Sequence, residues 1–584
     1  ELDQNKYPLI IRNRYADSFY GFLEAVLLAK APFHIVRELG IKADALHFND
    51  WQTGLGPVYM ESIYRHDPDF AMLSETGTVI ITHNLSYQGK FSSQEVVAVD
   101  DPLLAYLLGA GVLTLDQVHV QDNLVAIDLI SPNVNGDNLI NLPYELLNRT
   151  EKGLEFYGQY NFLKGGLDYA NRIVSVSQGY KYEMMTEQGG VGLHGIMLRR
   201  YKEGALTFVN NGIDLAANQP NHMKDLERKV VGDRKFTTFK FSDPNLVAKR
   251  RQNLLATVAL LKELADNPAN QDKIHGSLSE EGIEKDMTVV AVSRLVMQKG
   301  YSILFQVVDE QGMTLLEKIL AMRGENGEKI RLVFMASPGD PDGENTARQL
   351  RVLANDERFT GQLIFVELFD PALANQIRSG MDVFFMPSAW EPGGISNIQA
   401  AVIGLLTILT RTGGLYDFTK LGGTPEEITV VPFSYNLPES VRHTAWELVN
   451  AFALAFDRYR NNKEWWIEQV RIAMQFPGGW SDEKISAYNR IYNEAQAAAK
   501  EIVANRQAKA SSLILTTSEA DQARNFPVHI LEMDPKVADQ SVRVTAILKD
   551  RNTGVVDIKV ALLVSDELPV KRLEEALAYA FNQQ

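Results

Sequence analysis

The stretch Thr288–Gly300, TVVAVSRLVMQKG, indicates the fold class of this 584-residue chain. Its first half is an unbroken apolar and β-branched run, which is typical of a strand that is buried on both faces of a sheet. Its second half places Arg294 and Lys299 in the loop that leaves the strand. Ligands of open α/β sheets bind outside the carboxyl ends of strands, so two cations at this place suit a diphosphate. The plainer alternative is a pair of solvated loop cations.

Strand-like runs of the same kind recur along the chain, and helical patterns follow several of them. The runs are TVIIT (78–82), IVSVS (173–177), RLVFMA (331–336), QLIFV (362–366) and DVFFM (382–386), and the helical patterns cover 302–309, 344–355, 371–380 and 395–404. Strands that alternate with helices predict α/β domains with doubly wound parallel sheets.

Changes in pattern along the chain predict its domain boundaries. The alternation of strands and helices occurs in two blocks, separated by a polar connector with a helical stretch at 246–264, and a long Ala-, Glu- and Lys-rich helix covers 480–508. Strand-like segments with hairpin turn chemistry follow. The predicted parts are an N-terminal domain (1–225), a second domain with the connector (226–475), a helix that crosses back (476–509) and a small α+β domain (510–584).

Composition excludes several classes of protein. The chain has 58 Lys and Arg against 74 Asp and Glu, a net charge of −16, which is the wrong sign for a nonspecific nucleic-acid binder. It has no cysteine, which excludes a disulfide scaffold, a thiolate metal site and a cysteine nucleophile, and fits a cytoplasmic protein. No uninterrupted apolar stretch reaches the roughly 18 residues of a membrane span, so we expect no membrane partner.

The segment Met386–Ala401, MPSAWEPGGISNIQAA, is a second candidate for the ligand site. Gly393 and Gly394 open a helix, where a ligand can approach the backbone and free N–H groups can bind an anion. Glu391 would repel a phosphate, but it suits the hydroxyl groups of a sugar. The alternative is a surface glutamate that stabilises a helix start.

A third candidate is Thr410–Phe418, TRTGGLYDF, where two glycines again precede a helix start. We interpret it as a second anion-binding loop, although one such turn is weak evidence. The acidic pair of Asp340–Asp342 follows a strand in a turn, where aspartate is favoured for backbone reasons. We therefore expect no metal site and no cofactor.

Polar and aromatic residues also follow strands of the N-terminal block, in HFNDWQTGL (47–55) and THNLSYQGKF (82–91). Stacking on the apolar faces of sugar rings is expected of Trp51, Tyr87 and Phe91, and hydroxyl binding of Asp50, His83 and Asn84. The alternative is that the aromatic residues belong to the core and that the histidine is an ordinary loop residue.

Seven segments together resemble the bacterial glycogen synthases and plant starch synthases, over about residues 40–500. The resemblance implies the GT-B fold: two Rossmann-like domains face each other across a cleft, and a C-terminal helix crosses back. It also implies transfer of glucose, with retention, from a nucleoside diphosphate glucose to the 4-hydroxyl of an α-1,4-glucan. The segments, in chain order, are NDWQTGL, THNLSYQGKF, YGQYNFLKGG (157–166), NGID (211–214), VSRLVMQKG, the EPGG stretch and RTGGL.

The resemblance also implies roles for single residues. Arg294 and Lys299 correspond to the cations that bind the diphosphate, Glu391 to the residue that holds the donor glucose, and His83 to the histidine near the anomeric carbon. The implied sugar- and phosphate-site residues are Asp50, Trp51, Asn161, Gly393, Gly394, Thr412, Gly413, Gly414 and Leu415. Two cations stabilise a diphosphate leaving group without a strong general acid, so electrostatic stabilisation is expected to dominate.

Some features depart from the family pattern. No Lys-x-Gly-Gly loop precedes NDWQTGL, and the chain opens at Glu1 without a methionine, so either upstream residues are missing or part of the active site has been lost. Gly393 replaces the usual cysteine and Asn397 the usual glutamine. Two hypotheses remain: an active glucan-elongating enzyme of the cytoplasm (or of the plastid stroma in a plant or alga), or a non-catalytic subunit that binds glucan or nucleotide. Residues 510–584 are a candidate oligomerisation module or carbohydrate-binding appendage.

Overall fold

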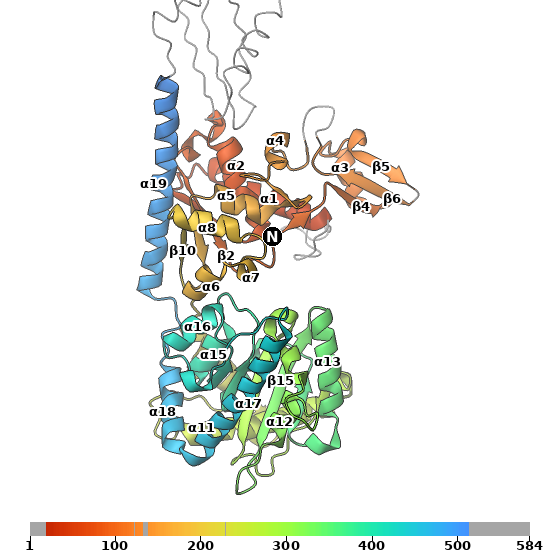
Figure 1. Cartoon of the computed structure of the whole chain (residues 1–584), viewed down its shortest axis with the longest axis vertical. Helices are drawn as coiled ribbons and strands as arrows, with labels where there is room; N and C mark the ends of the chain where they lie inside the picture. The colour runs from red at the N-terminus through yellow and green to blue at the C-terminus, as the bar shows by residue number, and fades with distance from the viewer. Residues whose placement is uncertain (1–18, 122, 132–137, 228, 513–584) are drawn as a thin grey trace, which may run out of the picture. The chain divides into compact units, whose positions relative to one another are not determined.

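The computed structural model describes residues 19–121, 123–131, 138–227 and 229–512 (Figure 1). The predicted α+β domain at 510–584 lies almost entirely outside these residues. Contacts divide the chain into two compact units: residues 1–174, 195–207 and 488–584, and residues 175–194 and 208–487. The predicted boundary between residues 225 and 226 does not coincide with this division, because residues 175–194 and 208–225 have more contacts with the second unit.

The first unit is built on a four-stranded sheet in the order β1-β2-β9-β10. β1 (Ala45–Asn49) and β2 (Gly77–Thr82) are parallel and paired from Ala45 with Gly77 to Asn49 with Ile81. All six residues of β2 are buried, as its apolar run predicts. The remaining elements are β9 (Arg172–Ser175), β10 (Leu206–Phe208), α2 (Leu55–Tyr59), α4 (Tyr144–Leu147), α5 (Phe162–Tyr169) and α8 (His194–Lys202).

Helix α1 (Phe19–Glu38) packs against α2 and the short turn at Trp51–Thr53. Its fully buried side chains include Phe22, Ala29 and Phe33. Within the described part of the chain it is the one helix that is long and apolar enough to cross a membrane, a test that core helices of soluble proteins also pass. The expectation that the chain has no membrane partner therefore stays a prediction.

Two small antiparallel sheets, which the sequence pattern did not predict, complete the first unit. One has the order β3-β8-β7, and the other has the order β4-β6-β5 with α3 (Pro102–Gly109) beside it. Their strands are β3 (Lys90–Phe91), β7 (Glu155–Phe156), β8 (Gln159–Asn161), β4 (Gln94–Ala98), β5 (Val118–Gln121) and β6 (Leu124–Asp128).

The C-terminal part of α19 (Asp482–Ser512) packs along the first unit, which confirms the predicted long helix. Gly77 has no room for a side chain because the backbone of Ala495 lies against it. His47 Nδ1 lies 3.0 Å from the hydroxyl of Tyr492. Burial lowers the pKa of His47 to about 4, so this histidine is neutral at physiological pH.

The second unit is built on a six-stranded sheet in the order β13-β16-β15-β14-β17-β18. The edge strand β13 is antiparallel to β16, and the other pairs are parallel, as predicted for a doubly wound sheet. The strands are β13 (Ile274–Gly276), β14 (Met287–Leu295), β15 (Ile330–Pro338), β16 (Leu363–Val366), β17 (Val383–Met386) and β18 (Leu406–Leu409), and β11 (Val230–Val231) and β12 (Arg234–Lys235) form a separate hairpin.

The helices of the second unit are α6 (Gln178–Glu183), α7 (Glu187–Gly190), α9 (Leu215–Asn218), α10 (Lys224–Glu227), α11 (Leu246–Asp266), α12 (Leu315–Ala321), α13 (Pro341–Ala354), α14 (Pro371–Gly380), α15 (Ser396–Ile403), α16 (Gly413–Lys420), α17 (Pro438–Asn461) and α18 (Lys463–Met474). They include four that agree with the predicted patterns at 246–264, 344–355, 371–380 and 395–404, namely α11, α13, α14 and α15, and others that were not predicted (Figure 1).

The predicted α-helix at 302–309 is wrong. The chain instead forms two 3₁₀ turns, Met297–Lys299 and Tyr301–Phe305. Gly300 joins them with a left-handed φ of +71°, which interrupts helical geometry and favours glycine. A side chain at Gly300 would also collide with the carbonyl oxygen of Pro387.

Candidate active site

His83 and Asp50 form a hydrogen-bonded pair at the carboxyl ends of β2 and β1. The carboxylate of Asp50 accepts from the backbone N–H of His83 at 2.7 Å and lies 2.9 Å from His83 Nδ1. This hydrogen bond raises the pKa of His83, against the opposing effect of burial. The contact fixes the ring at Nδ1 and orients Nε2, and the histidine side chain is 44% exposed.

The backbone of Asp50 is strained, with φ +54° and ψ −166°. Glycine occupies this region easily, and other residues persist there only when the surroundings hold them. Here the two hydrogen bonds to His83 and one from the Asp50 N–H to Ile81 O at 2.9 Å hold the residue. Strain of this kind gathers at functional sites, which supports the predicted role of Asp50 and His83.

Trp51, Phe91 and Asn161 do not have the roles expected of them. Trp51 is 5% and Phe91 1% exposed, and their rings pack on each other with centroids 6.0 Å apart, so neither presents a face on which a sugar could stack. Asn161 is fully buried: its side chain caps α5 by accepting from Lys164 N–H at 2.9 Å and donates to Gln88 at 2.7 Å. The alternative that the aromatic residues belong to the core is correct for Trp51 and Phe91, and the Trp51 ring lies against Gly89 of the loop that carries His83.

In the second unit, Lys299 and Glu391 come together although 92 residues separate them. β14 and β17 are parallel neighbours, so their carboxyl ends meet at one edge of the sheet. Lys299 Nζ lies 2.5 Å from Glu391 Oε2, and the hydroxyl of Ser388 donates to the same oxygen at 3.0 Å. The carboxylate is only 7% exposed. The site therefore presents a cation and a carboxylate side by side.

Arg294 lies within β14 and not in the loop after it, because the strand extends to Leu295. It is paired in register with Ser337 of β15, and its side chain is exposed. An exposed guanidinium at the end of the central strand is available to an anion. The prediction that Arg294 binds phosphate is compatible with this position and stays a prediction.

The glycines of the loop Thr410–Phe418 predict backbone donors that are free to bind a phosphate. The structure shows instead that these donors are already occupied. The carboxylate of Glu183 in α6 accepts from Gly413 N–H at 2.7 Å and from the Thr412 hydroxyl at 3.0 Å. Gly414 N–H donates to Glu391 O at 2.8 Å. The start of α16 thus already holds an anion that belongs to the chain itself.

The contact between α6 and α16 is reciprocal. Asp417 in α16 accepts from the N–H of Gly179 in α6, with oxygen distances of 3.0 and 3.2 Å. Each helix therefore receives at its N-terminus a carboxylate from the other, which is favourable for the helix dipole. Burial raises the pKa of both Glu183 and Asp417. Neither residue was predicted from the sequence, because neither lies in a recognisable capping motif.

The Leu415 side chain is fully buried, so it does not make the predicted contact with substrate.

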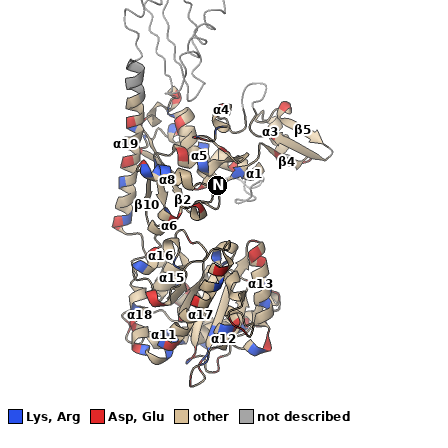
Figure 2. Ribbon diagram, viewed as in Figure 1, with Lys and Arg blue, Asp and Glu red and all other residues tan. Residues whose placement is uncertain are grey.

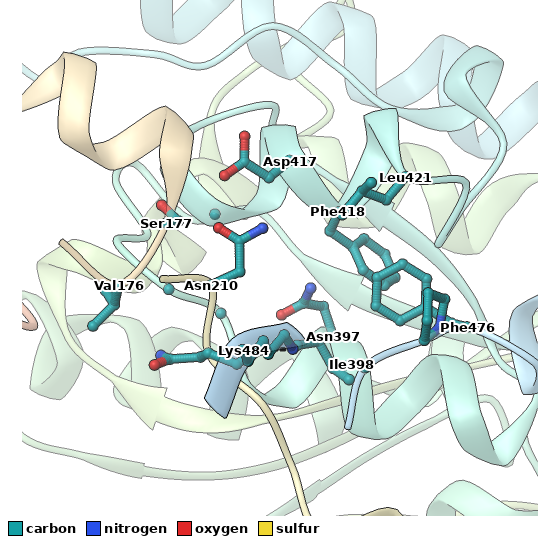
Figure 3. A pocket seen from close by; sticks show the side chains of 16 residues that line it. Val176, Ser177, Asn210, Asn397, Ile398, Asp417, Phe418, Leu421, Phe476 and Lys484 are labelled. Atoms are coloured by element: carbon teal, nitrogen blue, oxygen red, sulfur yellow. Dashed lines mark hydrogen bonds between the residues drawn. The ribbon is translucent and has the colours of Figure 1, made fainter. Parts of the chain in front are cut away.

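A pocket that is open to solvent on one side lies beside Gly393 and Gly394 (Figure 3). Asn397 is 1% exposed, and neither atom of its side-chain amide has a hydrogen-bond partner among the residues that the structure describes. Buried amides are nearly always paired, so this group is expected to meet water or a ligand. The lining residues are Val176, Ser177, Asn210, Asn211, Gly393, Gly394, Asn397, Ile398, Gly414, Asp417, Phe418, Leu421, Phe476, Pro477, Gly478 and Lys484.

Asp340 caps a helix: its carboxylate accepts from Gly343 N–H at 2.7 Å and from Met297 N–H at 2.8 Å. Across the described ranges, no group of three or more His, Asp or Glu residues is arranged to hold a metal ion. Lys and Arg are interspersed with Asp and Glu over the ribbon in Figure 2.

Comparisons with known proteins agree with the resemblance seen in the sequence. Residues 11–199 match the starch synthase catalytic domain, and residues 277–426 match group 1 of the glycosyl transferases. A glycogen synthase of Thermotoga maritima is 29% identical over 493 residues, which cover 84% of this chain and 80% of that protein. A glycogen synthase of Fervidobacterium nodosum is 28% identical, with 83% and 80% covered.

The catalytic domain of starch synthase IV from Arabidopsis thaliana, solved with ADP and acarbose bound, has a similar fold. It is 20% identical, with a TM-score of 0.55 over 81% of this chain and 77% of that one. This likeness confirms the predicted α/β fold of the GT-B class. Together, these matches support the glycogen synthase and starch synthase family of glucosyltransferases for this chain.

Proposed function

We propose that this protein transfers glucose from a nucleoside diphosphate glucose, with ADP-glucose or UDP-glucose as the donor, to the non-reducing end of an α-1,4-glucan with retention. The observation that carries the proposal is the Lys299–Glu391 pair at the carboxyl ends of β14 and β17. A nucleotide sugar presents a diphosphate next to a ring of hydroxyl groups. A cation next to a carboxylate complements that arrangement.

The residues divide the chemistry between them. Arg294 and Lys299 stabilise the negative charge that develops on the diphosphate when the bond between its oxygen and the glucose C1 breaks. Glu391 accepts hydrogen bonds from the donor glucose, and its backbone neighbours Gly393 and Gly394 allow close approach of the sugar. The Asp50–His83 pair supplies an oriented polar group to the sugar. We expect this reaction in the cytoplasm, as for the bacterial relatives.

Incubation of the protein with ADP-glucose or UDP-glucose and maltoheptaose tests the proposal by chain lengthening. We expect elongation by the wild-type chain and a loss of about 100-fold or more for Glu391→Gln, which removes a charge without changing shape. Glu439→Gln is a matched control, because the Glu439 side chain is 92% exposed. Absence of elongation by the full gene product would contradict the proposal and favour the alternative hypothesis of a non-catalytic subunit. Normal elongation by Glu391→Gln would contradict the assigned site.

A further inference from the structure

The hairpin between β7 and β8 carries an exposed tyrosine on a strained backbone. Tyr157 and Gly158 form its two-residue loop, with φ of +53° and +81°. Left-handed φ at both loop positions is what a tight hairpin turn requires, and Asn-Gly is the sequence that meets this requirement most easily. A tyrosine at the first position is unfavourable for the backbone, because its Cβ crowds the following carbonyl.

Packing does not explain the choice of tyrosine. The Tyr157 side chain is among the most exposed large side chains of the described residues, at 86%. Its ring makes an edge-to-face contact with the neighbouring Phe156, with centroids 4.8 Å apart. The loop itself is closed by a bond from Gly158 N–H to the Glu155 carboxylate at 2.9 Å, which does not need the ring. A strained residue that contributes little to the fold points to a role in binding.

The hairpin is fastened to the loop that carries His83. β8 pairs with β3, so Asn161 lies opposite Lys90. Phe162 N–H donates to Gly89 O at 3.0 Å, and Asn161 holds Gln88 through its side chain at 2.7 Å. Lys90 Nζ lies 5.4 Å from the Phe156 ring centre, which orients that ring. Short strand pairing therefore connects the exposed Tyr157 ring and the half-buried Phe156 ring to the polar site of this unit.

We propose that Phe156 and Tyr157, here called the hairpin platform, bind the α-glucan acceptor by stacking on its sugar rings. Tyrosine combines a flat apolar face with a polar tip, which suits a sugar ring with apolar faces and hydroxyl edges. Lys90 adds hydrogen-bond donors for hydroxyl groups. Of the three aromatic residues expected to stack on sugar, Trp51 and Phe91 are buried, whereas Tyr87 is 48% exposed and stays available together with the platform. The statement that the platform binds the acceptor rests on the proposed function, whereas the statement that it binds glucan does not.

Electrophoresis of the full chain through gels with and without glycogen, in the absence of donor, tests the platform. Tyr157→Asn removes the ring and suits the left-handed backbone. We expect glucan affinity to fall about two- to tenfold and the melting temperature to stay the same or rise. Tyr157→Phe keeps the ring and is expected to bind as wild type. Tyr106→Asn is a matched control, because Tyr106 is 58% exposed on α3 of the same unit.

Each outcome bears on the platform. Wild-type affinity in Tyr157→Asn, loss of affinity in Tyr157→Phe, or an equal loss in Tyr106→Asn would overturn it, as would a wild-type chain that does not bind glycogen. A chain that binds glycogen through Tyr157 but does not elongate maltoheptaose would uphold the platform and overturn the proposed transfer.

Discussion

The Lys299–Glu391 pair is expected to stabilise the second unit as well as to bind substrate. The side chains of Lys299 and Glu391 are only 16% and 9% exposed, and their charged atoms lie 2.5 Å apart. At an effective dielectric constant of about 20, the gross attraction at this distance is roughly 7 kcal/mol, most of which is offset by the loss of hydration of two buried charges. The net value is small, but removal of one partner leaves the other charge unpaired.

Lys299→Met leaves the Glu391 carboxylate with the Ser388 hydroxyl as its remaining side-chain donor. We expect this change to reduce the free energy of unfolding by about 3–5 kcal/mol. Glu391→Gln keeps an oxygen that can accept from Lys299, and we expect a loss of about 1–2 kcal/mol. The double variant buries no charge, and its loss is expected to be about 1–2 kcal/mol as well. The interaction energy of the cycle is therefore about 4 kcal/mol in magnitude.

Urea unfolding followed by tryptophan fluorescence measures all four proteins, with m-values compared to check that the transition is unchanged. Additivity of the two single losses within about 0.5 kcal/mol would refute the reasoning, because independent residues add. A double variant as unstable as Lys299→Met would refute it too, since the loss would then come from packing of the lysine stem.

Three further predictions follow from the site. Asp50→Asn replaces the carboxylate with a neutral amide, which weakens the hydrogen bond and removes the charge that raise the pKa of His83; NMR titration should therefore show His83 losing its proton at lower pH than in the wild type, and an unchanged midpoint would contradict the pair. The pKa of Glu183 is raised in the folded state, so the folded protein holds the Glu183 proton more tightly than the unfolded chain does. This contribution to the free energy of unfolding is complete at a pH below the pKa of an ordinary glutamate, and it is lost as the pH rises through the raised pKa of the folded state. The stability of the wild type relative to Glu183→Gln should accordingly fall with rising pH in melting scans, and a flat difference would exclude this effect. Asn397→Gln lengthens a buried amide that has no partner in the described part of the chain and should raise the melting temperature by about 2–4 °C; a lower value would show that the pocket has no room.

Most of the second sheet could be predicted from sequence, because strands buried on both faces are continuous apolar runs. The predicted strand at 331–336 and the predicted helix at 371–380 correspond to β15 and α14 with small or no shifts. The prediction of a helix at 302–309 failed for a reason outside the local pattern. Gly300 has a left-handed φ, and a side chain at this position would collide with the backbone of Pro387, which is distant in sequence.

The site was predictable in its residue types but not in its contacts. The sequence indicates that Lys299 and Glu391 follow strands, whereas their contact depends on β14 and β17 being neighbours, which strand patterns do not reveal. The burial of Trp51 depends on Gly89, where the tryptophan ring takes the place of a side chain. Glu183 was missed because it caps a helix more than 200 residues away along the chain.

The exchange of carboxylates between α6 and α16 has a consequence for engineering. Glu183 and Asp417 serve partners in each other's helices, so replacement of one helix by a sequence without its acid leaves a backbone N–H at the start of the other helix unmatched. A chimera with a relative that joins two sequences anywhere between residues 184 and 411 inherits this mismatch unless the relative carries both acids. With junctions outside that interval, both helices come from the same parent sequence and keep their matching acids.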